Sequence, residues 1–395
     1  MSLKAFALSI VIFVIIYRWK FFVPKNYIEP KIGNITSFVE SHGYTLEAHQ
    51  VQTEDGYILT IHRIPGSPKS PPLKNKPVVF LMHGLLFSSI DWVILGPKKA
   101  VGFMLADAGY DVWLGNTRGN TYSRSHIKLD PQNDKEKFFN YSYHDIGVFD
   151  LPAAIDYVLG KTDQNKISYI GFSQGVTSFL VMGSLKPEYN DKILLMNAFA
   201  PVTDMYNITS EIFNVLNRFP QLFKIADLLG WYEILDVSTQ PVFRMLCEFK
   251  PMCNLLFKIC GMSEEQMPDK EFALKILSNF PAGMATKQAK HYAQGTATGL
   301  FAPFNENISA VTSHNIYDLS KVTVPIILYF GESDNVINHL RLTRDVASQL
   351  PNVKHIFKVP YTNFNHLDFL WGKDNRLLYD EVIRNIHKYN KQIKS

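Results

Sequence analysis

The sequence lacks several features that would direct it to nucleotides, metals or nucleic acids. It contains no phosphate-cradling G-x-x-x-x-G-K-S/T loop, no C-x-x-C pair and no H-E-x-x-H zinc helix. The 40 basic and 36 acidic residues give a formal net charge of only +4, and they are mixed along the chain without a basic stripe. Nucleic-acid binding is therefore not expected, because it needs a concentrated positive surface. No internal repeat or low-complexity tract is present.

Cysteine is scarce, whereas apolar residues are plentiful. The 3 cysteines are Cys247, Cys253 and Cys260, all in one stretch. An oxidising compartment would allow one short disulfide there and leave one thiol over. Of the 395 residues, 46% are hydrophobic and 13% aromatic, enough for a large core. The length allows two or three domains, although α/β folds often use more residues per domain.

The first 20 residues form a segment of their own. Lys4 precedes an apolar run of 13 residues, from Ala5 to Tyr17. This length suits the apolar region of a signal peptide and is shorter than the ~20 residues needed to span a bilayer. No small-x-small cleavage site follows, so an uncleaved signal anchor at residues 1–20 is the alternative. Both interpretations predict the secretory pathway, with a secreted or lysosomal destination.

Glycosylation acceptors support export. Four asparagines open N-x-S/T sequons, namely Asn34, Asn140, Asn207 and Asn307. Several sequons in one exported chain are more informative than one, and we expect Asn34 to be used.

A candidate nucleophile lies in the pentapeptide Gly171-Phe172-Ser173-Gln174-Gly175. The apolar run 167–170 precedes it, and an apolar helical stretch, 176–185, follows. This order is typical of the nucleophile elbow of the α/β-hydrolase fold, where a sharp strand-to-helix turn exposes one hydroxyl above the sheet. The tight turn leaves no room for β-carbons beside Ser173, which explains the two glycines.

A serine hydroxyl is a weak nucleophile, so the elbow predicts an acid and a histidine base later in the chain. Asp334 follows the apolar run 324–330, where the carboxyl end of a parallel strand is expected. His366 lies on the loop after the last β-rich run, 355–359. We expect His366 to take the proton from Ser173 while Asp334 fixes its tautomer.

Other residues compete for the two roles. His339 follows Asp334 too closely and lies in an expected helix, 338–350. Glu332 and Asp368 are alternative acids. Asp368 is only two residues from His366, and we expect it to cap or anchor that loop.

An oxyanion hole requires two backbone N–H groups, one just after the nucleophile and one from the loop after an early strand. Residues 77–82 are predicted to form that strand, and His83-Gly84-Leu85-Leu86 follows directly. We therefore expect the donors to be the N–H groups of Leu85 and Gln174, the latter at a helix N-terminus. Alternatively, His83-Gly84 merely closes a turn.

Strands alternate with helices along most of the chain, which predicts a mostly parallel sheet covered on both faces. A hairpin about Asp55-Gly56 opens this sheet. The alternation stops between residues 202 and 319, a helical and strongly apolar stretch. We expect residues 21–201 and 320–395 to form the core, with residues 202–319 inserted as a helical cap and lid. Most apolar side chains of such an insertion pack internally, and only some face substrate.

The chain resembles the acid lipase family of gastric and lysosomal lipases from Tyr27 to about Tyr389. Beyond the elbow, the motifs that carry the resemblance are residues 53–59 (TEDGYIL), 83–86 (HGLL), 113–120 (WLGNTRGN), 150–153 (DLPA) and 365–369 (NHLDF). One departure is Phe172, where the family pattern usually has histidine. Because residue 172 is outside the proton relay, we expect altered packing near the elbow and retained activity.

The resemblance implies hydrolysis of carboxylic esters of neutral lipids, triacylglycerol or sterol ester, without a cofactor. It carries the nucleophile onto Ser173, the acid onto Asp334, the base onto His366 and the oxyanion donors onto Leu85 and Gln174. It also favours a disulfide between Cys247 and Cys253, with Cys260 free. The implied partner is neutral lipid at a lipid–water interface, with membrane contact transient or through an uncleaved N-terminal anchor.

Two alternative functions remain at this stage. One is a catalytically silent lipid carrier on the same scaffold, and the other is an esterase for small lipophilic esters. The sequence contains no indication of the oligomeric state.

Overall fold

The computed structural model describes residues 34–203 and 205–394. The predicted signal peptide or anchor, residues 1–20, lies outside the described residues. None of the helices in the described ranges has the length and apolar character that a bilayer crossing demands.

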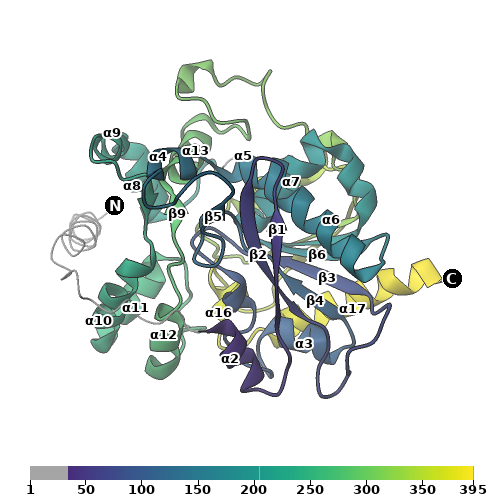
Figure 1. Cartoon of the computed structure of the whole chain (residues 1–395). Coiled ribbons are helices and arrows are strands. Elements are labelled where there is room, and N and C mark those ends of the chain that lie inside the picture. The colour runs from purple at the N-terminus through teal and green to yellow at the C-terminus, as the bar shows by residue number, and fades with distance from the viewer. Residues whose placement is uncertain (1–33, 204, 395) are drawn as a thin grey trace.

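A nine-stranded sheet forms the centre of the molecule (Figure 1). Its strands lie in the order β1-β2-β4-β3-β6-β7-β10-β11, and β5 pairs with β2. From β4 to β11 every neighbouring pair is parallel, whereas β1, β2 and β5 make antiparallel pairs. The bounds are β1 Glu47–Gln52, β2 Tyr57–Ile64, β3 Val78–Met82, β4 Asp111–Leu114, β5 Ser125–His126, β6 Ile167–Phe172, β7 Ile193–Phe199, β10 Ile326–Phe330 and β11 Val353–Lys358.

The central strands are buried along their whole length because helices cover both faces of the sheet. Successive side chains of β3 alternate between two cores: Val79 and Leu81 enter one, and Val78 and Phe80 enter the other. The first core also contains apolar residues of α3 (Val101–Asp107) and α17 (Arg376–Lys394), and the second those of α6 (Leu151–Thr162) and α7 (Gln174–Leu185). The predicted parallel sheet with two covered faces is therefore confirmed.

The shorter helices connect these layers. They are α2 Ile35–Glu40, α4 Lys135–Phe138, α5 Tyr143–Asp145, α14 His339–Arg341, α15 Ala347–Gln349 and α16 Asp368–Trp371. A π-helical segment, Ile146–Asp150, lies directly before α6. Pro152 follows this segment in the first turn of α6.

The stretch between β7 and β10 contains mostly helices, which lie beside one end of the sheet (Figure 1). They are α8 Glu211–Arg218, α9 Gln221–Leu228, α10 Gln240–Glu248, α11 Lys250–Ile259, α12 Lys270–Leu277 and α13 Thr286–Thr298. A short antiparallel ribbon of β8 (Glu233–Ile234) and β9 (Met284–Ala285) connects them. We call residues 202–319 the insertion.

A buried arginine fastens the loop after β4 to two other segments. The Arg118 guanidinium donates to Asp150 at 2.7 Å and to both carboxylate oxygens of Asp55 at 2.6 and 2.9 Å. Burial raises the pKa of Asp150 to about 6, although Arg118 favours its charged form. The ion pair therefore joins the β1–β2 hairpin turn to the start of α6.

Candidate active site

Ser173 occupies a strained turn between β6 and α7. Its φ of 51° and ψ of −113° place a non-glycine residue outside the common regions. A Cβ at position 175 would lie 2.2 Å from the carbonyl oxygen of Met82, so only glycine allows the end of β3 to pass there. The chain thus makes the sharp strand-to-helix turn expected from the pentapeptide.

The structure brings Ser173, His366 and Asp334 together although they are far apart in sequence. His366 Nε2 lies 2.9 Å from Ser173 Oγ, and His366 Nδ1 lies 2.9 and 3.1 Å from the two oxygens of Asp334. Carboxylate oxygens accept hydrogen bonds, so Nδ1 carries the proton and Nε2 is free to accept from the serine hydroxyl. All three side chains are buried.

Backbone donors hold the carboxylate of Asp334 in place. Its Oδ1 atom accepts from the N–H groups of Val336 and Ile337 at 2.9 and 3.2 Å. These bonds fix the side chain toward His366. The arrangement can move a proton from a hydroxyl to an imidazole whose other nitrogen faces a carboxylate.

The three competing residues lie elsewhere. Glu332 is exposed and forms an ion pair with Lys358 at 2.6 Å. His339 begins α14 and stacks on Phe330. Asp368 accepts from the N–H of Asn365 at 2.7 Å, so it anchors the histidine loop as expected.

Asn365 is a contact that the sequence reasoning missed. Its Oδ1 accepts from the N–H of His366 at 2.7 Å and from the N–H of Asn335 at 3.0 Å. One side chain therefore joins the loop of His366 to the loop of Asp334. The position directly before His366 was the only signal in the sequence.

The insertion also contacts the histidine loop, which sequence reasoning did not predict. Leu367 donates its N–H to the carbonyl oxygen of Gly261 at 2.8 Å, and Ser263 donates its N–H to Asp368 at 3.1 Å. A Cβ at Gly261 would lie 3.2 Å from His366 Cβ. Burial raises the pKa of Asp368 to about 7, and the nearby charge of Asp334 adds to the rise.

The loop after β3 runs directly beside the elbow. A Cβ at Gly84 would lie 2.9 Å from the Phe172 ring and 3.1 Å from Ser173 Cβ. His83 holds this loop: its Nδ1 donates to the Gly84 carbonyl oxygen at 2.7 Å, and its Nε2 accepts from Thr117 N–H at 3.2 Å. Burial lowers the pKa of His83 to about 4, which keeps the ring neutral.

The two expected oxyanion donors lie on these two turns. Leu85 follows Gly84, and Gln174 is the first residue of α7, so its N–H has no acceptor within the helix. The insertion supports both turns. Ala282 donates its N–H to the Leu86 carbonyl oxygen at 2.8 Å, and Gln288 Nε2 donates to Gln174 Oε1 at 3.0 Å.

Phe172, the departure from the family pattern, packs against the base. Its ring centroid lies 5.0 Å from that of His366 and 5.4 Å from that of Phe87. The side chain is fully buried and makes the apolar wall behind the imidazole.

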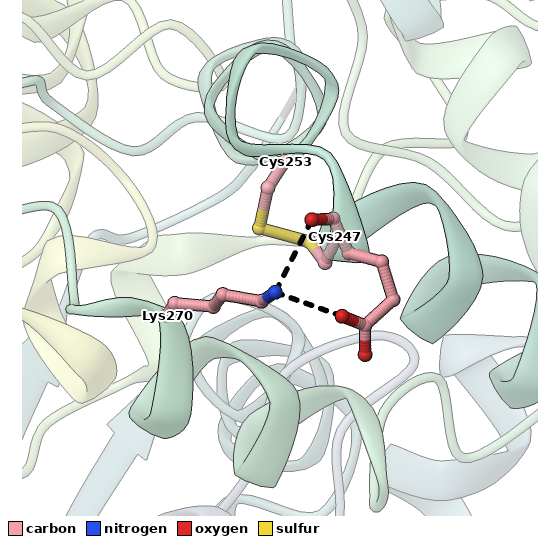
Figure 2. Close-up of a disulfide and its surroundings, with 4 residues drawn as sticks. Cys247, Cys253 and Lys270 are labelled. Atoms are coloured by element: carbon pink, nitrogen blue, oxygen red, sulfur yellow. Dashed lines mark hydrogen bonds and ion pairs between the residues drawn. A yellow bond between two sulfur atoms is a disulfide. The ribbon is translucent and has the colours of Figure 1, made fainter.

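The disulfide between Cys247 and Cys253 is confirmed, and Cys260 is free. Figure 2 shows the bond joining the end of α10 to α11, with Lys270 beside it. The Lys270 Nζ atom lies 2.8 Å from the Glu248 carboxylate and 3.2 Å from the Glu248 carbonyl oxygen. Burial raises the pKa of the Cys260 thiol to about 12, which makes it a poor nucleophile.

The four sequon asparagines, Asn34, Asn140, Asn207 and Asn307, are all exposed. Among the described residues, no cluster of three or more histidine, cysteine, aspartate or glutamate side chains could hold a metal ion.

Comparison with known families identifies the fold and its chemistry. Residues 35–96 match the family model described as a partial alpha/beta-hydrolase lipase region, and residues 77–373 match that of the alpha/beta hydrolase fold. Among solved structures, a carboxylesterase and a naproxen esterase, both from Bacillus subtilis, superpose with TM-scores of 0.51 each. The two esterases are 13% and 14% identical to this chain. The alignments cover 90% and 92% of this chain and 98% of each esterase, so the similarity shows the fold alone.

Curated relatives are similar over nearly the whole chain. Lipase 3 of Drosophila melanogaster is 40% identical, covering 89% of this chain and 92% of that protein. Human gastric triacylglycerol lipase is 33% identical, with coverage of 91% and 92%. Lysosomal acid lipase/cholesteryl ester hydrolase of Macaca fascicularis is 34% identical, with coverage of 90% and 91%. The chain therefore belongs to the α/β-hydrolase family of gastric and lysosomal acid lipases and is a carboxylic ester hydrolase.

Proposed function

We propose that the protein is a serine lipase that hydrolyses carboxylic esters of neutral lipids, triacylglycerol or sterol ester, through an acyl-enzyme intermediate. Ser173 is the nucleophile, His366 the base and Asp334 the acid. The observation that carries this proposal is the chain of contacts Ser173 Oγ to His366 Nε2 to Asp334, with distances of 2.9 Å at each step.

In the acylation step, Ser173 Oγ attacks the ester carbonyl carbon while His366 Nε2 accepts its proton. Asp334 stabilises the imidazolium that forms. His366 then gives the proton to the leaving alcohol, and the acyl group stays on Ser173. A water molecule, deprotonated by the same imidazole, releases the carboxylic acid and restores the serine.

The tetrahedral intermediates of both steps carry a negative oxygen. We assign its stabilisation to the N–H groups of Leu85 and Gln174. Supporting this assignment, Gly84 approaches Ser173 closely, and the first N–H groups of α7 lie at the positive end of that helix. Because hydrogen bonds from the insertion support both turns, these donors are positioned before substrate arrives.

A lipid substrate is supported by the apolar surface of the insertion. We assign residues 21–201 and 320–395 to the core and residues 202–319 to a cap and lid over the site. Leu228 and Phe249 are 86% and 63% exposed, and Ile225, Leu229 and Met245 are exposed beside them in sequence. Exposed apolar side chains of this kind suit transient contact with a lipid surface. The relatives named as triacylglycerol lipase and cholesteryl ester hydrolase are consistent with bulky esters.

The alternative substrate class is small lipophilic esters. A silent carrier is disfavoured because nucleophile, base and acid are all present and in contact. We further propose a secretory destination, secreted or lysosomal, because the four exposed sequons follow an apolar N-terminal run.

Hydrolysis of emulsified trioleoylglycerol, cholesteryl oleate and a soluble butyrate ester by the full chain tests the proposal. Ser173→Ala should lower kcat at least about 10⁴-fold on every substrate while the protein remains folded. Ser333→Ala is the matched control, because Ser333 is exposed and adjacent to Asp334. Turnover retained in Ser173→Ala would remove Ser173 as nucleophile, and turnover of the butyrate alone would favour the small-ester alternative.

A further inference from the structure

A cavity lies between the insertion and the core, apart from the catalytic residues. Its volume is about 720 Å³, within the roughly 300–1,000 Å³ typical of small-molecule sites. Helices α11 and α12 and residues 264–270 form one wall, and Leu95, Lys99 and residues 371–373 of the core form the other. None of Ser173, Asp334 and His366 lines it.

Apolar side chains form the floor of this cavity. Phe257, Ala273 and Trp371 are buried there, and Leu95, Met267 and Phe272 are half-buried beside them. The disulfide-bonded Cys247 and Cys253 also line the cavity. A hydrocarbon chain placed on this floor would remove apolar surface from water on both partners.

Positive charge surrounds the floor. Lys99, Lys250, Lys270 and Lys373 line the cavity and are exposed, whereas only Glu264 and Asp269 are acidic. The Asp269 carboxylate already accepts from the N–H of Phe272 as the cap of α12, and Lys270 pairs with Glu248. Lys99, Lys250 and Lys373 make no ion pair with any residue in the described part of the chain.

An apolar floor with unpaired ammonium groups at its rim is complementary to an amphiphile with an anionic head. We propose that this cavity binds a free long-chain carboxylate, the acid that ester hydrolysis releases. The hydrocarbon chain of the acid lies on the floor near Phe257 and Trp371, and its carboxylate lies between Lys250 and Lys373. The site rests on the proposed neutral-lipid substrate, because that reaction supplies acids with long chains.

The cavity is separate from the catalytic residues but close to them. Trp371 packs against Phe87 with ring centroids 4.8 Å apart, and Phe87 packs against Phe172 at 5.4 Å. Phe172 in turn lies against His366 at 5.0 Å. A bound acid would therefore contact the aromatic cluster behind the base without entering the oxyanion hole.

Binding must be measured with the catalytic site filled, because that site also accepts acyl chains. The full chain is first treated with a p-nitrophenyl alkylphosphonate, which forms a P–O bond to the reactive serine and releases p-nitrophenolate. Dodecanoate is then titrated calorimetrically below its micellar concentration. We expect one dodecanoate to bind per blocked enzyme, and dodecanol, with the same tail and no charge, to bind about tenfold more weakly.

Charge reversal tests the location of the head group. Lys250→Glu with Lys373→Glu should weaken dodecanoate binding about tenfold or more. Lys161→Glu with Lys166→Glu is the matched control, because both lysines are exposed, lie outside the cavity and give the same change in charge. Ala273→Trp, which fills the floor, should abolish binding. Hydrolysis of a soluble butyrate ester reports that each variant is folded.

Several results would overturn the proposal. They are no binding to the blocked enzyme, equal binding of dodecanol, or equal losses in the control pair. Lysine-dependent binding to phosphatidylglycerol vesicles without dodecanoate binding would assign the cavity to a membrane surface instead. Failure of the phosphonate to label Ser173 would contradict the proposed function. In that case the charge-reversal pair, measured against its control pair, still shows whether dodecanoate binding depends on the cavity lysines.

Discussion

Asn365 offers a test of how the two catalytic loops are held together. Replacing it with alanine removes Oδ1, which accepts from the N–H groups of His366 at 2.7 Å and Asn335 at 3.0 Å. Both donors then lose their partner, one in the loop of the base and one in the loop of the acid.

The expected magnitude follows from these two bonds. Each is worth about 0.5–1.5 kcal/mol net, so Asn365→Ala removes about 1–3 kcal/mol. If this stabilisation is lost from the transition state, kcat falls about 5- to 150-fold, since about 1.4 kcal/mol corresponds to a factor of ten. KM should change little, because the substituted residue orients the base and does not bind the ester.

The assay is hydrolysis of a soluble ester, with kcat and KM determined separately and folding checked by urea denaturation. Asn365→Asp retains an oxygen acceptor and should recover most of kcat. Asn363→Ala is the matched control, because Asn363 is exposed in the same loop and its side chain donates to Glu265 at 2.8 Å, away from the catalytic residues. Wild-type kcat in folded Asn365→Ala would refute the reasoning, as would an equal loss in Asn363→Ala.

Three further substitutions test other parts of the structure. Gly84→Ala puts a Cβ 2.9 Å from the Phe172 ring and should lower kcat about tenfold or more; unchanged kcat would argue against the oxyanion assignment. Burial raises the pKa of Asp91 to about 7, above its value in the unfolded chain, so protonation stabilises the folded form. Relative to Asp91→Asn, the wild type should lose up to about 4 kcal/mol of stability as pH rises from about 4 to about 7. Urea denaturation that shows a constant difference would contradict this shift. Arg118→Met leaves Asp150 buried without its cation and should cost about 3–5 kcal/mol by the same assay, and a loss below about 1 kcal/mol would show that the ion pair is dispensable.

The sequence predicted the parts of the site that depend on local backbone rules. The elbow at Ser173 could be predicted because a strand, two glycines and a helix lie within one short stretch. Asp334 and His366 followed from chain order and from the edge of the sheet at which parallel strands end. Their side chains do meet, at the distances that a proton relay requires.

The supporting contacts could not be predicted because they join segments without local signals. The hydrogen bond from Leu367 to Gly261 links residues about a hundred positions apart, and neither sequence pattern indicates it. Asn365 was visible only as a polar residue next to the base. The apolar periodicity of residues 202–319 indicated helices but not which of them contact the core, because internal packing gives the same pattern.

The hydrogen bonds that cross from the insertion have a consequence for engineering. Gly261 and Ser263 hold the loop that carries the His366 imidazole. Ala282 holds the loop after β3, and Gln288 holds the side chain of Gln174. A minimal enzyme without the insertion would keep every reactive side chain. It would lose the hydrogen bonds that hold three segments next to those side chains. Any chimaera with a foreign insertion must therefore reproduce those few hydrogen-bond partners before its specificity can be redesigned.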